Sequence, residues 1–404
     1  WMREIAICGP ICPDGFRWCT DTGFREICSV EYNSPQMRIA ADSSLNFLYR
    51  MSRSSFVRVL TSLLLPASAC VVLAFAAGVH VTAAQTHARD LTIYTIDVEG
   101  GQSTLIVSPT GATMLVGAGW GGNKGRDAER IMAVMKDAGV TELGRVFITH
   151  FHTDHVGGVP NLVERVKVGE FLDHGVNRED SDITRHDYAA YVKAIGTTSR
   201  RIVHPGDTID ISGLSTIVLT ADGEHIKSVP GVKPELNPYC ASEPRWELDS
   251  TENPRSAGVL IRYGKFRFLD LGDLTKAKEI PLVCPANLIG HVDLYLVNHH
   301  GFNLSNSKAF VDAIHPRVAI MNNGAHKAGS PEAYATVHAS PGLQDLYMLH
   351  TAEDSDAAHN SSAPLVANLK GGSDGNYFKI VARADGSFSV MNSRTGETKE
   401  YAAR

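Results

Sequence analysis

Four side chains of the types that can bind metal ions lie within six residues in the middle of the chain, in the run His150-Phe151-His152-Thr153-Asp154-His155. The run follows the apolar residues 143–149, which are typical of a buried strand. His150 and His152 are two positions apart, so their side chains point the same way in extended backbone. Asp154 and His155 follow after a turn and can face a second point. Imidazole and carboxylate groups are ligands of zinc and similar ions, so the run predicts a metal site.

Two other strand ends carry residues with the same chemistry. The apolar residues 266–271 are followed by Gly272 and Asp273, and residues 294–298 are followed by His299 and His300. A buried charge such as that of Asp273 costs free energy unless it is paired or bound to a metal. We therefore expect both segments to bring ligands to the same edge of the sheets as the histidine run.

The elements that must position these residues alternate between strands and helices. Apolar residues at every second position predict strands, and apolar residues at helical spacing predict helices. The expected strands cover residues 91–98, 103–108, 113–116, 143–149, 168–172, 215–220, 258–263, 266–271, 294–298, 318–322, 377–383 and 387–392. The expected helices cover residues 126–138, 307–314 and 331–340, and another starts at 162–166. The alternation predicts an α/β fold with two sheets between outer helices, and residues 353–376 are expected to form a surface loop.

The composition is that of an ordinary globular protein. The chain of 404 residues is 43% hydrophobic and 20% charged, and its formal net charge is −6. Proteins that bind nucleic acids usually carry a basic face, and we find no basic stretch interleaved with aromatic residues. We therefore expect a small-molecule substrate; a nucleic acid is not indicated, and no pattern specifies an oligomeric state.

Residues 51–84 are typical of a signal peptide. Arg53 and Arg58 supply a positive start, residues 59–79 carry no charge, and Thr82-Ala83-Ala84 forms a small-residue cleavage site. We expect a periplasmic or secreted protein with no stable membrane span after cleavage; an uncleaved anchor is the alternative. Residues 1–50 are interpreted as a non-native or disordered upstream segment, and residues 90–400 as one domain that ends in a hairpin.

Two cysteines, Cys240 and Cys284, remain in the expected mature chain. A disulfide between them fits an oxidising compartment, and two free buried thiols are the alternative. Neither cysteine falls in a spacing that is typical of metal ligands.

Together these motifs resemble a known family. The run HFHTDHVGG matches the HxHxDH signature of the metallo-β-lactamase superfamily. The set IDVEGGQSTLIVSPTGATMLV, FLDLGDL and LVNHHG is similar to the hydrolase domain of ComEC-type competence proteins, to pneumococcal phosphorylcholine esterase and to a group of exported bacterial metallo-hydrolases. The matching motifs span residues 91–350. The resemblance implies the four-layer αββα metallo-β-lactamase sandwich and a metal-dependent hydrolase.

The resemblance also implies a ligand scheme for two metal ions. His150 and His152 would hold the first ion, Asp154 and His155 the second, and Asp273 would bridge both. His300 would complete the second site and His299 would face the substrate, although these two histidines could exchange roles. The expected cofactors are two zinc ions, or manganese or iron in their place.

The last histidine of the first site is open among three candidates at this point. His174 follows the expected strand 168–172 and is the favoured choice, while His225 and His204 are the alternatives. The chain also departs from the family pattern, because Gly117 stands where the strand-end motif Leu-Val-Asp-x-Gly has its aspartate. That aspartate usually contacts metal ligands from outside and orients them, so its absence puts the metal affinity in question.

The expected function is that of an exported dinuclear metal-dependent hydrolase. Two dications about 3.5–4 Å apart lower the pKa of a shared water toward about 7, so that a bridging hydroxide attacks phosphorus or a carbonyl carbon. Asp154 would orient this hydroxide, and His299 would help to stabilise the developing charge. The bridging Asp273 favours phosphoester substrates; hydrolysis of a β-lactam or another cyclic amide or ester is the alternative, and a non-catalytic binding protein is the alternative from a different class. Arg255 either meets an anionic substrate or is solvated.

Overall fold

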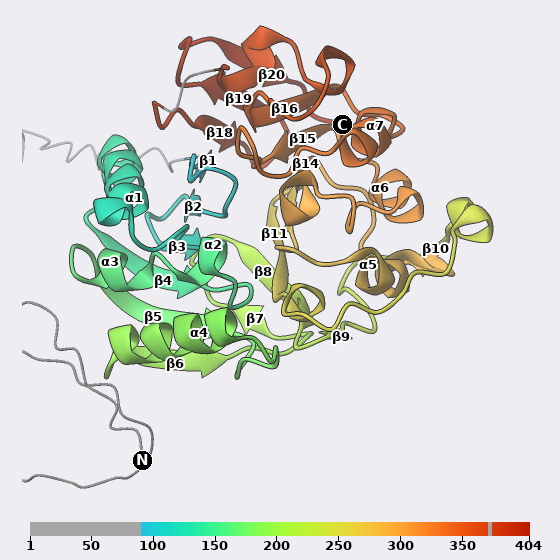
Figure 1. Ribbon diagram of the computed structural model, residues 1–404. Helices are drawn as coiled ribbons and strands as arrows, with labels where there is room; N and C mark the ends of the chain where they lie inside the picture. Colours follow the sequence, from blue (N-terminus) through green and yellow to red (C-terminus); the bar gives the residue numbers. More distant parts are fainter. Residues whose placement is uncertain (1–89, 371–373) are drawn as a thin grey trace, which may run out of the picture. The chain divides into compact units, whose positions relative to one another are not determined.

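The computed structural model describes residues 90–370 and 374–404 (Figure 1). The expected signal peptide, residues 51–84, and the upstream segment 1–50 lie outside the described residues. Among the helices of the described part, none combines the length and apolar character needed to cross a membrane.

The first large sheet has nine strands in the order β20-β19-β18-β1-β2-β3-β4-β5-β6. Strands β3 to β6 pair in parallel, and the other neighbours pair antiparallel. The strands are β1 (Leu91–Thr95), β2 (Thr104–Val107), β3 (Thr113–Val116), β4 (Glu142–Phe147), β5 (Lys167–Asp173), β6 (Ser199–Ile202), β18 (Phe378–Ala382), β19 (Phe388–Asn392) and β20 (Thr398–Tyr401).

The second large sheet runs in the order β17-β16-β15-β14-β12-β11-β8-β7, with β9 paired to β8. Strands β12, β14, β15, β16 and β17 are parallel to one another. The strands are β7 (Thr208–Ile209), β8 (Ser215–Ala221), β9 (Glu224–His225), β11 (Gly258–Tyr263), β12 (Phe266–Asp270), β14 (Leu294–Leu296), β15 (Val318–Met321), β16 (Asp345–His350) and β17 (Val366–Asn368). A separate two-stranded sheet pairs β10 (Glu235–Leu236) with β13 (Ala286–Asn287).

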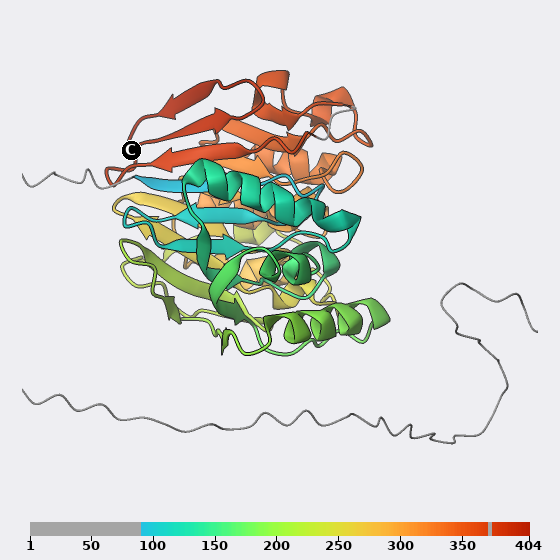
Figure 2. The ribbon, with the colours of Figure 1, turned by 90° about the vertical axis from the view of Figure 1, so that its left-hand side faces the viewer.

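Helices cover the outer face of each large sheet, as Figures 1 and 2 show. Helices α1 (Arg126–Ala138), α3 (Val159–Val163) and α4 (Asp182–Ile195) lie on the first sheet, and α5 (Lys276–Val283), α6 (Lys308–Ile314) and α7 (Pro331–His338) lie on the second. Three apolar clusters fill the spaces between these layers: one between the sheets, and one under each set of helices. The predicted αββα sandwich is therefore confirmed.

Alternation along the strands explains why each sheet is covered on both faces. Ile93 packs between the two sheets, while its neighbour Tyr94 packs under the helices of the first sheet. On the second sheet, Phe268 packs between the two sheets, and its neighbour Leu269 packs under the helices. Successive side chains of a strand point to opposite faces, and burying each large apolar side chain contributes about 1.5–3 kcal/mol.

Element boundaries differ from the sequence prediction mainly at strand ends. The expected strand 143–149 ends at Phe147, and the expected loop 353–376 contains the buried strand β17 (Val366–Asn368). Three residues are too few to show a periodic pattern, which explains why β17 has no sequence signal. The two cysteines form a disulfide, so the first of the two alternatives for Cys240 and Cys284 holds.

Candidate metal centre

The predicted ligand segments lie at the carboxyl ends of three strands. The histidine run follows β4 of the first sheet, Asp273 follows β12 of the second, and η4 (Asn298–Gly301) carries His299 and His300 directly after β14. The short helix α2 (Thr153–Val156) turns the chain within the run. Gly158 lets the chain after this helix pass close to Ala118, because a Cβ atom there would lie 2.0 Å from the carbonyl oxygen of Ala118.

Four of these residues converge on one point and are called the enclosed group: Asp154, His155, Asp273 and His300. All four are buried. His155 Nε2 lies 3.1 Å from both His300 Nε2 and Asp273 Oδ1, and His300 Nε2 lies 3.3 Å from Asp273 Oδ1. Asp154 Oδ2 lies 3.4 Å from His155 Nε2 and 3.2 Å from His300 Nε2. A tetrahedral ion with bonds of about 2.0–2.1 Å requires ligand atoms about 3.3 Å apart, so the donor set fits a zinc-sized ion.

His150, His152 and Asp273 form a second set of neighbouring ligand atoms, called the open group. His150 Nε2 lies 3.7 Å from Asp273 Oδ2, whereas the enclosed group uses the other oxygen of the same carboxylate. Asp273 therefore belongs to both groups. His152 differs from the rest, because its side chain is 23% exposed and its Nε2 lies 2.8 Å from Glu179 Oε2.

His299 and His300 occupy distinct places. His300 belongs to the enclosed group, as expected, while His299 Nε2 lies 3.5 Å from Asp273 Oδ2. Both residues have positive φ, and the N–H of His299 donates to the carbonyl oxygen of Gly272. Burial lowers the pKa of His299 to about 4, so this imidazole is neutral at pH 7.

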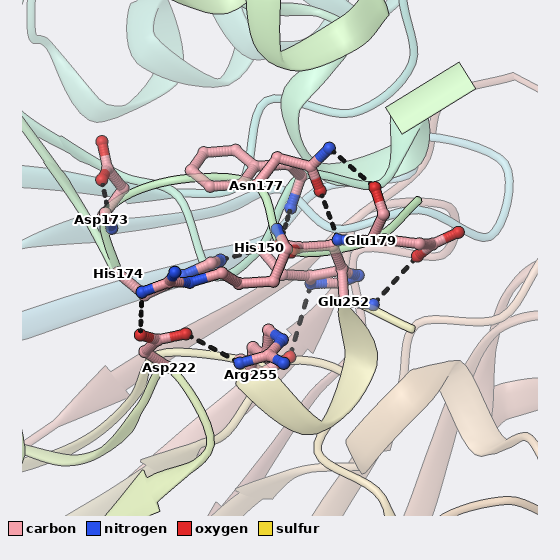
Figure 3. A network of polar contacts seen from close by, with 12 residues as sticks. His150, Asp173, His174, Asn177, Glu179, Asp222, Glu252 and Arg255 are labelled. Carbon is pink, nitrogen blue, oxygen red and sulfur yellow. Dashed lines mark hydrogen bonds and ion pairs between the residues drawn. The ribbon is translucent and has the colours of Figure 1, made fainter. Parts of the chain in front are cut away.

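None of the three candidates for the last histidine joins either group in the described part of the chain. His174 Nε2 lies 2.8 Å from Glu252 Oε2, and both side chains are fully buried (Figure 3). His174 therefore uses its Nε2 to contact Glu252, and not a metal position of either group. His204 is exposed beside Asp207, and His225 is half-buried in β9.

Carboxylates that the sequence did not single out hold this side of the site together. Glu252 Oε1 accepts a hydrogen bond from the N–H of Arg178, and Glu179 Oε2 accepts one from the N–H of Glu252 (Figure 3). Arg255 Nη1 lies 2.9 Å from Asp222 Oδ1, so Arg255 is paired with a carboxylate.

Two hydroxyl groups orient the histidine rings from behind. Thr149 Oγ1 lies 3.1 Å from His150 Nδ1 and 2.9 Å from His155 Nδ1. Ser256 Oγ lies 3.4 Å from His150 Nδ1 and accepts a hydrogen bond from the N–H of Asp273. When Thr149 accepts from both rings, each ring carries its proton on Nδ1 and presents Nε2 to an ion.

Two buried ligand atoms lack a hydrogen-bond partner among the described residues, namely His150 Nε2 and Asp273 Oδ1. Buried polar atoms are rarely left unpaired, because each one costs free energy. Their positions, one in each group, are those where a bound cation would supply the missing partner.

The carboxylates of the site are held in the charged form. Burial raises the pKa of Asp273, but His155 and His300 outweigh it and hold this pKa well below its usual range. Burial is likewise outweighed at Asp154, whose pKa His155 and Lys327 hold well below its usual range. Burial lowers the pKa of His155, yet Asp273 and Asp154 raise it to about 9. The centre is therefore built to hold positive charge.

Lys327 lies at the edge of the site, in the loop after β15. Its Nζ forms an ion pair with Asp154 Oδ2, donates to the carbonyl oxygen of Gly100 at 2.7 Å, and lies 4.6 Å from the ring centre of Trp120. The side chain is 27% exposed. No sequence motif pointed to this residue, since it meets Asp154 only through the fold.

A third set of possible ligands, Asp97, Glu99 and His350, already contains a cation. Arg130 Nη1 lies 3.0 Å from Asp97 Oδ2, and its Nη2 lies 3.2 Å from Glu99 Oε1. His350 Nε2 lies 2.7 Å from Asp97 Oδ1. The guanidinium neutralises these carboxylates, so this set is an ion-pair network.

A protein of known sequence resembles more than half of this chain. Recombination protein 2 of Haemophilus influenzae is 23% identical over 231 residues, which are 57% of this chain and 24% of that protein. This chain thus spans about a quarter of the length of that relative, and the match supports the ComEC-like branch that the motifs indicated.

Solved structures that resemble this chain include YhfI from Bacillus subtilis, at 11% identity and a TM-score of 0.39. The match covers 64% of this chain and 96% of the YhfI chain. CmlA, a diiron β-hydroxylase from Streptomyces venezuelae, has 15% identity and a TM-score of 0.34 over 64% of this chain and 48% of that one. The family model of the metallo-beta-lactamase superfamily matches residues 96–321, more than half of the chain. The chain therefore belongs to the metallo-β-lactamase superfamily of metal-dependent hydrolases.

Proposed function

We propose that this protein is an exported dinuclear metal-dependent phosphoesterase. The observation that carries the proposal is the position of Asp273, which offers one oxygen to the enclosed group and the other to the open group. A carboxylate shared in this way suits two ions that act together on the oxygens of a phosphate group. Zinc fits the histidine and carboxylate ligands, and manganese or iron would also accept them.

The bound ions would supply a water with a lowered pKa and would neutralise the charge that develops on the reacting group. The chain's own residues orient the participants. Thr149 and Ser256 hold the rings of His150 and His155 in place, and Asp154 joins the enclosed group to Lys327 through an ion pair. His299 is neutral at pH 7 and can exchange a hydrogen bond with the substrate without adding charge.

The position of Lys327 favours the proposal that the substrate is anionic. Its ammonium group lies at the rim of the site beside Trp120, and it is partly exposed. A cation at this position can meet a non-bridging phosphate oxygen or another anionic group of the substrate. Trp120 offers an apolar wall beside it.

Export is supported by the disulfide between Cys240 and Cys284, because such bonds persist mainly in oxidising compartments. It agrees with the signal-peptide pattern of residues 51–84. Mass spectrometry of the secreted or periplasmic protein tests this part, and a protein that stays reduced and uncleaved in the cytoplasm would contradict it.

Elemental analysis paired with two substrates tests the activity. The purified mature protein is expected to contain two ions per chain and to hydrolyse bis-p-nitrophenyl phosphate but not nitrocefin. Hydrolysis of nitrocefin alone would move the assignment to β-lactam chemistry. A folded protein that binds no metal and hydrolyses neither substrate would favour the non-catalytic binding protein.

The variant His152→Ala tests the role of the open group within this proposal. The variant is expected to fold, because His152 is partly exposed and contributes little to the core. It should lose metal-dependent turnover by about a thousandfold, since several kcal/mol of transition-state stabilisation depend on the ions. Full activity in this variant would refute the assignment.

A further inference from the structure

Gly117 stands where the family pattern has an aspartate, and the structure leaves no room for one. A Cβ atom on Gly117 would lie 2.3 Å from the carbonyl oxygen of Gln102, and the backbone there has a φ of 72°. Any side chain at this position would displace the Gln102 backbone. The support that an aspartate at 117 would give to the metal ligands must therefore come from elsewhere.

The side chain of Gln102 reaches a buried carboxylate from the other sheet. Gln102 Nε2 donates to Asp270 Oδ1 at 2.9 Å and to Asp270 Oδ2 at 2.8 Å. The two residues are 168 positions apart in the sequence, and each is only 1% exposed. A buried carboxylate needs such donors, so this pair fixes the distance between the loop after β1 and the end of β12.

The backbone of Gln102 is tied to the ligand-bearing segment of the first sheet. Its N–H donates to the carbonyl oxygen of Asp154 at 3.0 Å, and its carbonyl oxygen accepts from the N–H of Gly119 at 3.0 Å. Gln102 therefore holds the backbone of one residue of the enclosed group while its side chain holds Asp270.

Asp270 is tied in turn to the ligands of the second sheet. Its Oδ1 accepts a hydrogen bond from the N–H of Gly272 at 3.1 Å, directly before Asp273. The carbonyl oxygen of Gly272 accepts from the N–H of His299 at 3.0 Å. One continuous path of hydrogen bonds thus joins the three segments that carry the enclosed group.

We propose that Gln102 and Asp270 are the positioning residues of the enclosed group and take the place of the aspartate that the family pattern has at position 117. Among the described residues, neither Gln102 nor Asp270 forms a hydrogen bond with a ligand side chain; both act through the backbone and through each other. They set the spacing between Asp154, in α2 after β4, and Asp273, in the turn after β12, and this spacing fixes the geometry in which an ion is bound. The inference rests on the proposed metal centre.

The variant Gln102→Leu keeps the volume of the side chain and removes both hydrogen bonds to Asp270. We expect the affinity for one of two zinc ions to fall by about 10–100-fold, as for other outer contacts of metal ligands. A chromophoric zinc chelator measures this affinity by competition, and the visible absorption spectrum of the cobalt-loaded protein should change in the same variant.

Exchange of the amide and the carboxylate between positions 102 and 270 provides the rescue experiment. In the double variant Gln102→Glu/Asp270→Asn, an amide at 270 can donate to a carboxylate at 102 and still accept from the N–H of Gly272. We expect this double variant to recover most of the zinc affinity, whereas Gln102→Glu alone places two carboxylates together and should lose it. Asp270→Leu removes the acceptors of Gln102 Nε2 and should lower the zinc affinity in the same way, so it serves as the test if Gln102→Leu does not fold.

Asn392→Leu is the matched control, because Asn392 is a buried amide that bonds to Pro364 and Val366 at the far edge of the sandwich. It should lower thermal stability without changing zinc affinity. A Gln102→Leu protein that is less stable but binds two zinc ions as the parent does would overturn the inference and leave the proposed function intact. Absence of metal from the parent protein would instead overturn the proposed function.

Discussion

The two candidate ion positions share Asp273 but are built differently. Every residue of the enclosed group is buried, and its histidine Nε2 atoms already lie 3.1–3.4 Å from each other and from the carboxylate oxygens. The open group has only His150 and His152 besides the shared carboxylate, and Nε2 of His152 is engaged by Glu179. Ligands from three strand ends thus give a preformed position. The open group adds only two histidines of one loop to the shared carboxylate, and Nε2 of His152 must leave Glu179 to bind an ion.

Asp273→Asn is expected to have the largest effect, because it removes the charge that both groups share. Both ions should be lost together, and turnover should fall by about a thousandfold or more, which corresponds to several kcal/mol. Metal content and phosphodiester hydrolysis measure this. Asp312→Asn, which changes a buried carboxylate paired with Lys308 on α6, is the control and should retain both ions. Loss of only one ion in Asp273→Asn would show that the carboxylate is not shared.

A chelator should remove the two ions one after the other from the unmutated protein. The ion of the open group is expected to leave first, since its ligands are fewer and one of them is partly exposed. Titration with a chelator, followed by the metal content at each step, should give two phases, and activity should disappear with the first. A single phase would mean that the groups bind as one unit.

Glu179→Gln should raise the metal affinity of the open group and leave that of the enclosed group unchanged. The carboxylate competes for Nε2 of His152, so a weaker acceptor should free this ring for an ion. A hydrogen bond contributes about 0.5–1.5 kcal/mol, so the affinity of the open group should rise by about two- to tenfold. Competition with a chelator measures the change. An unchanged or lower affinity would mean that Glu179 supports the ion.

Asp97→Asn should leave both groups unaffected, because Arg130 already neutralises this third set of carboxylates. Burial raises the pKa of Asp97, but His350 and Arg130 hold it below its usual range. Such a group stabilises the fold above its unfolded-state pKa of about 3.9 and loses this effect as the pH falls through the folded-state value.

The variant should therefore be less stable than the parent by about 1.5–3 kcal/mol at pH 7, and the difference should shrink below about pH 4. Denaturant unfolding at several pH values measures it, and metal content serves as the control. A loss of bound ions in Asp97→Asn would place this network within the metal centre.

Local sequence patterns could predict the segments that carry the ligands, because each follows an apolar strand. The run from His150 to His155, Asp273 and His300 were all found in this way, and the fold brings them together. His174 lies at a strand end as expected but falls in neither ligand group of the described residues. Its partner Glu252 lies 78 residues away, and no sequence pattern marks this pairing.

Contacts that support the site were beyond sequence reasoning for the same reason. Gln102 lies inside the segment IDVEGGQSTLIV, yet its role depends on a hydrogen bond to Asp270 from the other sheet. Lys327 meets Asp154 across 173 positions. Spacing within one element can be read from the sequence, whereas the pairing of side chains from different layers requires the fold.

Thr149 has a consequence for how such a centre can change. One hydroxyl oxygen faces the rear nitrogens of two imidazoles, and these rings serve different ions. Replacement by valine, which has the same shape but no oxygen, would remove this contact from both rings at once. A substitution at position 149 therefore changes the orientation of both rings, and with it the affinity of both ion positions. A chain with another residue here needs other hydrogen-bond partners for both rings.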